Sequence, residues 1–83
     1  MSTEKHFGST LQKLRLAKNL SQVELAQLSG LDRTFISLLE RGRSQPSLAT
    51  LFSLGKGLEM KPHELVREME NSLRRRRWGL LKK

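Results

Sequence analysis

The sequence predicts a single all-α domain of five helices, and three observations lead to this prediction. Apolar residues recur at intervals of three and four along most of the chain, as they do on one face of a helix. No segment alternates apolar and polar residues in the manner of a strand, and β-branched residues are few. A chain of 83 residues without cysteine has room for one small domain, which must be held together by helix packing, by oligomerisation, or by both.

Two helices are predicted in the first third of the chain, at about residues 7–19 and 22–29. The first places three apolar residues at helical spacing: Phe7, Leu11 and Leu14. His6 stands ahead of it and is expected to be a solvated terminal residue. The second helix begins after Ser21, because a serine followed three residues later by a glutamate satisfies the free amides of a helix start. Its buried face holds Leu25 and Ala26, and Gly30 suits the left-handed position that ends a helix.

Three further helices are predicted at about residues 33–40, at 48–58 and from Pro62 onward. Asp32 and Ser47 are suited to cap the first two of these, because their side-chain oxygens can accept from free backbone amides. A proline fits the first position of a helix, where its missing amide hydrogen costs nothing. The apolar faces of the first two consist of Ile36 and Leu39, and of Leu51, Phe52, Leu54 and Leu58.

The net charge of +8 is distributed unevenly, and it divides the chain at residue 70. Residues 1–70, the predicted domain, hold ten Lys/Arg and eight Asp/Glu, whereas residues 71–83 hold six Lys/Arg and no acidic residue. This basic extension suits nucleic acid or an anionic membrane surface. It could extend the fifth helix along DNA phosphates, pack against the domain or a partner chain through Trp78 and Leu80, dock on a membrane, or stay solvated.

Several classes of protein are excluded by what the sequence lacks. No apolar run approaches the roughly 20 residues that span a bilayer, and the first residues lack the pattern of a secretory signal. We therefore expect a cytoplasmic protein that does not act at a membrane. No Ser-His-Asp set, glycine-rich phosphate loop or metal-ligand spacing is recognisable, so we expect no enzyme activity, no cofactor and no metal.

The stretch from Ser21 to Gly42 is the most informative part of the chain. Two short amphipathic helices flank a Gly-Leu-Asp turn, an arrangement that can place the second helix in the major groove of DNA. With Ile36 and Leu39 inward, residues 33, 34, 37 and 38 fall on or near the opposite face. Arg33 can read guanine through two parallel hydrogen bonds, or it can grip phosphate or lie in solvent.

The remaining residues of that outer face leave alternatives open. The hydroxyl groups of Thr34 and Ser37 suit bases and phosphates about equally. Leu38 can meet thymine methyl groups, or it can pack against Phe35 or simply be exposed. Phe35 can itself brace the turn.

Three segments give the chain its resemblance to a known family: LSQVELAQLSGLD, the I-x-x-x-E-x-G pattern of residues 36–42, and PSLATLFSLGKGLEMKPHEL. With these, the sequence resembles the XRE (Cro/C1-type) helix-turn-helix regulators over about residues 7–66. Within that family, LDRTFIS is similar to the controller proteins of restriction–modification systems. The resemblance implies a five-helix, lambda-repressor-like domain that regulates transcription and binds double-stranded DNA at inverted repeats as a homodimer.

The resemblance also implies roles for particular residues. The implied contacts to base edges come from Arg33, Thr34, Ser37 and Leu38. The implied contacts to the DNA backbone come from Gln22, Phe35, Arg41 and Arg43. Arg15 and Glu40 occupy positions that commonly form an internal ion pair between the first and third helices.

An apolar stripe along the fifth helix predicts how two copies pair. It consists of Leu65, Val66, Met69 and Leu73, with Phe52 and Met60 from neighbouring segments. A twofold dimer would set the recognition helices about 34 Å apart, which is one turn of DNA. In the alternative interpretation, the stripe binds a second, different protein, as in the antitoxin half of a toxin–antitoxin pair.

Overall fold

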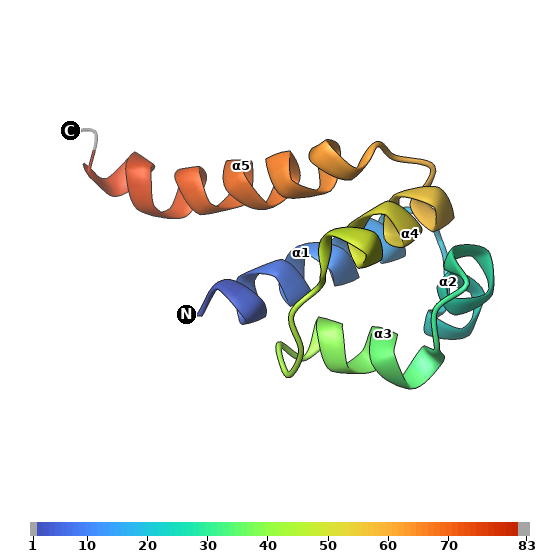
Figure 1. Cartoon of the computed structure of the whole chain (residues 1–83). Coiled ribbons are helices and arrows are strands. Elements are labelled where there is room, and N and C mark those ends of the chain that lie inside the picture. Colours follow the sequence, from blue (N-terminus) through green and yellow to red (C-terminus); the bar gives the residue numbers. More distant parts are fainter. Residues whose placement is uncertain (1, 82–83) are drawn as a thin grey trace.

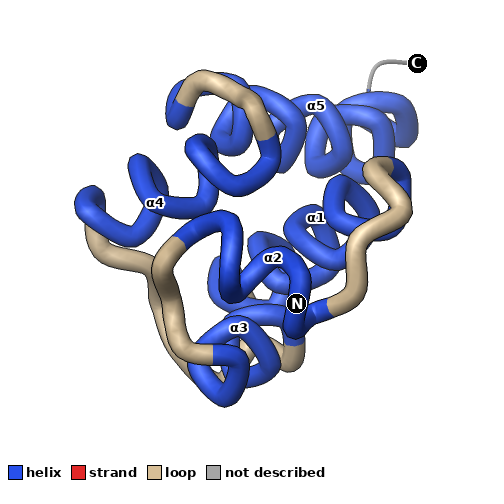
Figure 2. The backbone as a smooth tube through the Cα atoms, turned by 90° about the vertical axis from the view of Figure 1, so that its right-hand side faces the viewer, coloured by secondary structure: helices blue, strands red, loops and turns tan. Residues whose placement is uncertain are grey.

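A computed structural model describes the backbone of residues 2–81 and the side chains of residues 2–74. Five helices follow one another along the chain, and residues 2–81 contain no strand, so the predicted all-α fold is confirmed (Figure 1). They are α1 (Thr3–Ala17), α2 (Gln22–Ser29), α3 (Arg33–Glu40), α4 (Leu48–Leu58) and α5 (Pro62–Leu81). Helix α1 lies between α3 on one side and α5 on the other, and α3 and α5 lie at opposite ends of the molecule in both views (Figure 2).

The hydrophobic core receives side chains from all five helices. Helix α2 packs on α4 and α3, and α5 covers α1 and α4. Apolar residues withdrawn almost completely from solvent form one cluster: Phe7, Leu11, Leu25, Ala26, Ile36, Leu39, Leu54, Leu58 and Leu65. Both predicted inward residues of α3, Ile36 and Leu39, belong to it. The opposite face of α3 is therefore fixed in orientation by the core.

Polar side chains set the helix starts where the sequence predicts them. The hydroxyl of Ser21 accepts from the amide of Glu24 at 3.0 Å, while the Glu24 carboxylate accepts from the Ser21 amide at 2.8 Å. Asp32 caps α3 and Ser47 caps α4 in the same manner, each accepting from a backbone amide at 3.0 Å. Gly30 ends α2 at a φ of +73°, as expected of a left-handed terminal residue.

Helix α1 begins earlier than the sequence predicts. It starts at Thr3 and not at residue 7, because Ser2 caps it by accepting from the Lys5 amide at 3.1 Å. The prediction that His6 is solvated is wrong. His6 is 4% exposed, and its Nε2 donates to the carbonyl of Met69 on α5 over 3.3 Å. Because α5 packs over the first half of α1, it covers and stabilises this additional first turn of α1.

Helix α5 runs without a break across residue 70, where the charge pattern divides the chain. Its second half continues beyond the other helices (Figure 1). The basic extension is thus an extension of α5. The predicted roles of Trp78, Leu80 and the arginines after Arg74 concern side chains outside the described set. Among the helices that the structure describes, none is long and apolar enough to cross a bilayer.

Candidate nucleic-acid interface

The turn between α2 and α3 holds α3 at the surface of the molecule. It consists of three residues, Gly30, Leu31 and Asp32, and the Leu31 amide donates back to the carbonyl of Ala26 at 3.1 Å. Leu31 packs against the core, which anchors the turn from inside. As a result α3 forms one edge of the molecule, with its outer side uncovered (Figure 1).

Four of the predicted DNA-contacting residues share this outer side of α3. Arg33 and Thr34 are exposed, and Ser37 and Leu38 are half-buried. Within the described part of the chain no acidic side chain forms an ion pair with Arg33. Its guanidinium is therefore available to a ligand. Leu38 does not pack against the core cluster, so both interpretations of this residue stay open.

Phe35 behaves differently from its neighbours. Its ring packs against the core, so the structure favours the interpretation in which Phe35 braces the turn. A phenyl ring also has no donor for a phosphate oxygen. A contact between Phe35 and the DNA backbone would have to use its main-chain amide, and it stays a prediction.

Two arginines lie just beyond the C-terminal end of α3. Arg41 caps the helix, and its Nε donates to the carbonyl of Ser37 at 3.4 Å. The amide of Arg43 donates to the carbonyl of Leu38 at 2.9 Å, which folds the chain back at Gly42. Both side chains are exposed. This loop thus carries two cations next to the outer side of α3.

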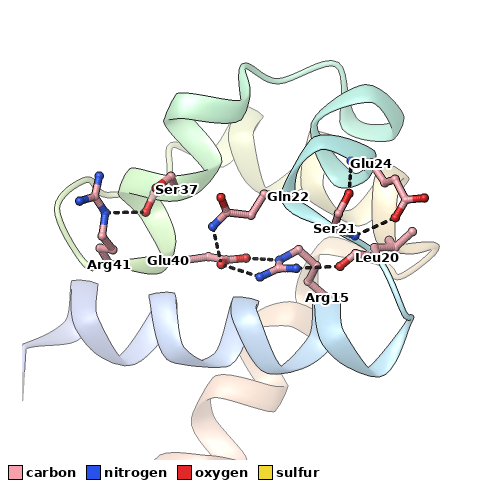
Figure 3. A network of polar contacts seen from close by, with 8 residues as sticks. All are labelled: Arg15, Leu20, Ser21, Gln22, Glu24, Ser37, Glu40 and Arg41. Atoms are coloured by element: carbon pink, nitrogen blue, oxygen red, sulfur yellow. Dashed lines mark hydrogen bonds and ion pairs between the residues drawn. The ribbon is translucent and has the colours of Figure 1, made fainter.

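A buried polar network joins α1, α2 and α3 on the inner side of α3 (Figure 3). The predicted ion pair is present: Arg15 Nε lies 2.6 Å from Glu40 Oε2, and Arg15 Nη2 lies 3.0 Å from Glu40 Oε1. The two side chains are 8% and 2% exposed. The hydrogen bond to Glu40 raises the pKa of Arg15 above its ordinary value. Arg15 Nη1 also donates to the carbonyl of Leu20 at 2.7 Å, which fixes the end of α1.

Gln22, the first residue of α2, belongs to this same network. Its Nε2 donates to Glu40 Oε1 at 3.0 Å. A carboxylate only accepts, so this bond decides which end of the amide faces inward. One N–H of Gln22 is engaged, and no acceptor for the other is found among the described side chains. A phosphate contact through this second N–H stays a prediction.

The predicted dimer surface needs one correction. Leu65 is 1% exposed and belongs to the core of its own chain, so it offers no surface to a partner. Met69 packs partly against the same core, and Leu73 is half-buried. Of the four predicted residues, Val66 is the most open, at 45%.

Among the described side chains, an exposed apolar surface instead spans α4 and α5. Leu48 and Phe52 are 77% and 66% exposed, and with Val66 they line a hollow of about 490 Å³. Leu48 was not among the residues predicted for the dimer surface. The signal was its spacing of four residues from Phe52, which places both on one side of α4.

The described residues include no group of three or more His, Asp or Glu side chains that could hold a metal ion. The fold thus presents a short helix, α3, at its surface. A three-residue turn joins α3 to α2, and arginines flank it. These features define a helix-turn-helix protein of the DNA-binding type. The profile of the helix-turn-helix family HTH_3 matches residues 11–65, and the chain belongs to this family.

Known relatives agree with this assignment. The HTH-type transcriptional regulator y4dJ of Sinorhizobium fredii is 39% identical over 66 residues, which cover 80% of this chain and 86% of the relative. The control protein C.BamHI of Bacillus amyloliquefaciens is 39% identical over 61 residues, covering 72% and 75%. The predicted resemblance to XRE-type regulators, including controller proteins, is thereby confirmed.

Solved structures support the same conclusion. The restriction–modification controller protein C.AhdI from Aeromonas hydrophila is 46% identical with a TM-score of 0.71, covering 74% of this chain and 92% of its own. Wild-type C.Esp1396I, also a restriction–modification controller protein, is 30% identical with a TM-score of 0.78, covering 88% and 95%. The chain is accordingly a sequence-specific transcriptional regulator, and its family is not one of enzymes.

Proposed function

We propose that the protein binds an inverted-repeat operator as a homodimer, with α3 of each copy in the major groove. One observation carries this proposal: α3 is locked on its inner side by Ile36 and Leu39 and by the Glu40 network, while no side chain among residues 2–74 forms an ion pair on its outer side. A base-reading helix must be held rigidly and stay uncovered, and α3 meets both conditions.

Base readout in this proposal centres on Arg33. Its position at the start of α3 agrees with the rule that the first residues of a recognition helix reach base edges. A guanidinium fork donates to O6 and N7 of one guanine, which contributes about 1–3 kcal/mol of discrimination. Thr34, Ser37 and Leu38 complete the reading surface.

Backbone contacts in this proposal lie at both ends of the motif. Gln22 offers its second N–H at the N-terminus of α2, where free backbone amides also favour an anion. Arg41 and Arg43 offer cations beyond α3. Such contacts orient the protein on DNA and supply most of the affinity, whereas base contacts select the site.

The proposed dimer contact is the apolar surface of Leu48, Phe52 and Val66. An apolar patch of this kind rarely stays exposed in a soluble monomer. Pairing two copies across a twofold axis would bury it in both and would set two α3 helices one DNA turn apart. The names of C.BamHI, C.AhdI and C.Esp1396I favour the genes of a restriction–modification system as the target.

The test is binding to DNA upstream of the protein's own gene, compared with shuffled DNA of equal length over a salt series. We expect a preference of roughly a thousandfold or more. Sedimentation of the pure protein should show a dimer. Equal affinity for both DNAs would contradict binding at that site, and a stable monomer with a free apolar face would favour the antitoxin-like alternative.

A further inference from the structure

The first turn of α1 lies directly against the loop that follows α3. Gly42 has a φ of +73°, and its backbone packs on the side chain of Lys5 so closely that an added Cβ would lie 2.7 Å from the Lys5 Cα. The Cγ of Lys5 is also in contact with this position. The aliphatic stem of Lys5 therefore runs over the Arg41–Gly42–Arg43 turn.

Two further contacts fasten the same pieces together. The side-chain amide of Gln45 donates to the carboxylate of Glu4, one residue before Lys5. One turn later, Gly8 lies so close to the end of α3 that an added Cβ would come within 2.6 Å of the Glu40 carbonyl oxygen. Positions 4, 5 and 8 of α1 thus hold the loop, and the placement of Lys5 does not depend on one contact.

The charges around Lys5 are favourable for an anion. Lys5, Arg41 and Arg43 are all exposed, and none of the ion pairs found among the described side chains involves them. Of the nearby carboxylates, Glu40 is paired with Arg15, whereas Glu4 accepts from the neutral amide of Gln45 and keeps its charge, which leaves three cations against one carboxylate. Glu4 lines a separate hollow together with Phe7 and Met69. Lys5 is not part of that hollow.

We propose that Lys5 contacts a DNA phosphate beside Arg41 and Arg43, so that the first turn of α1 forms part of the DNA interface. This inference rests on the proposed function. Lys5 on α1 and the two arginines of the turn are three cations, which together can neutralise neighbouring phosphates at the edge of a half-site. No base edge is involved, so Lys5 adds affinity for every sequence equally.

The test compares Lys5→Met with Lys13→Met in the full chain. Methionine keeps an aliphatic stem over Gly42 and removes only the charge, so the fold should survive, which thermal unfolding checks. Lys13 lies on the same helix but beside Glu68 and Ser72 of α5, away from α3. Each Lys5 engaged should lower the slope of log affinity against log salt by about 0.9, or about 1.8 for a dimer on two half-sites.

The expected result is a flatter slope for Lys5→Met, the wild-type slope for Lys13→Met, and recovery in Lys5→Arg. The loss should be the same on operator and shuffled DNA. An unchanged slope for Lys5→Met, with wild-type operator preference intact, would overturn the role of Lys5 alone. Failure of the wild-type protein to prefer any operator would instead count against the proposed function.

Discussion

Arg15 of α1 and Glu40 of α3 form a two-pronged ion pair, with nitrogen–oxygen distances of 2.6 and 3.0 Å, that is almost closed to solvent. The pair connects the first helix to the end of the recognition helix. Gln22 adds α2 through the same carboxylate. One carboxylate therefore connects α3 to both neighbours, in addition to the core contacts of Ile36 and Leu39.

Glu40→Ala should strongly destabilise the fold, because it leaves the Arg15 charge buried without a partner. The expected loss is about 3–5 kcal/mol in the free energy of unfolding, measured by thermal or urea denaturation. Arg67→Ala is the matched control, since its ion pair with Glu64 is exposed and 3.7 Å long, and it should cause little change. If Glu40→Ala melted like the wild type, the pair would have no structural role.

Arg33→Ala should weaken operator binding without changing the melting temperature, because the side chain is exposed and forms no ion pair with any side chain that the structure describes. Discrimination at one guanine should fall by about 1–3 kcal/mol, measured by competition among single-base operator variants. Arg33→Lys separates base readout from a phosphate contact, since lysine keeps the charge but lacks the two parallel donors of the guanidinium. Full specificity in Arg33→Lys would show that Arg33 only grips phosphate.

Phe52→Ala should shift the protein from dimer to monomer in sedimentation, because an aromatic anchor is lost from each side of the proposed contact. A weakening of the dimer by more than about tenfold is expected. Phe52 is mostly exposed, so the fold should stay intact. Leu28→Ala removes an exposed apolar side chain from α2, away from this surface, and should leave the dimer unchanged.

Gly8→Ala should destabilise the fold although alanine is the better helix former. The added Cβ would meet the backbone carbonyls at the end of α3, which cannot rotate away. Overpacking of this kind costs about 1–3 kcal/mol, measured by urea denaturation. Gln12→Ala is an exposed control on the same helix. A more stable Gly8→Ala variant would contradict the close approach of α1 and α3.

Glu64→Gln should remove a pH-dependent contribution to stability. The Lys61 amide donates to the Glu64 carboxylate at 2.8 Å, and this bond lowers the pKa of Glu64 below its ordinary value. A carboxylate with a lowered folded-state pKa stabilises the fold above its unfolded pKa, and the effect is lost as the pH falls through the folded-state value. Wild type should therefore exceed Glu64→Gln in melting temperature at pH 7 and lose that advantage in acid. Glu70→Gln, at an exposed position of the same helix, is the charge-matched control.

Much of the fold follows from the sequence because its signals are local. Ser21, Asp32 and Ser47 fix helix starts through bonds that span two or three residues, and Gly30 fixes an end through its own backbone. The outward placement of Ser37 and Leu38 follows equally directly, because residues one and two positions from the inward-facing Ile36 point away from its side of the helix.

What the sequence could not provide depends on residues far apart in the chain. His6 is buried by α5, whose carbonyl partner lies 63 residues away. Leu65 belongs to the core and Leu48 to the surface because of how α4 and α5 cross, although both are leucines on amphipathic helices. The hydrogen bond from Gln22 to Glu40 is also set by tertiary packing, since Glu40 lies 18 residues further on.

The single carboxylate of Glu40 has a consequence for how the protein opens. An element held only by local bonds can fray while the rest of a domain stays folded. Helix α3 has eight residues and would be only marginally stable in isolation. Its detachment from the domain would also break the ion pair between Glu40 and Arg15. Its backbone amides should consequently exchange with heavy water only when the whole domain unfolds. The recognition helix that meets DNA is then either fully formed or absent.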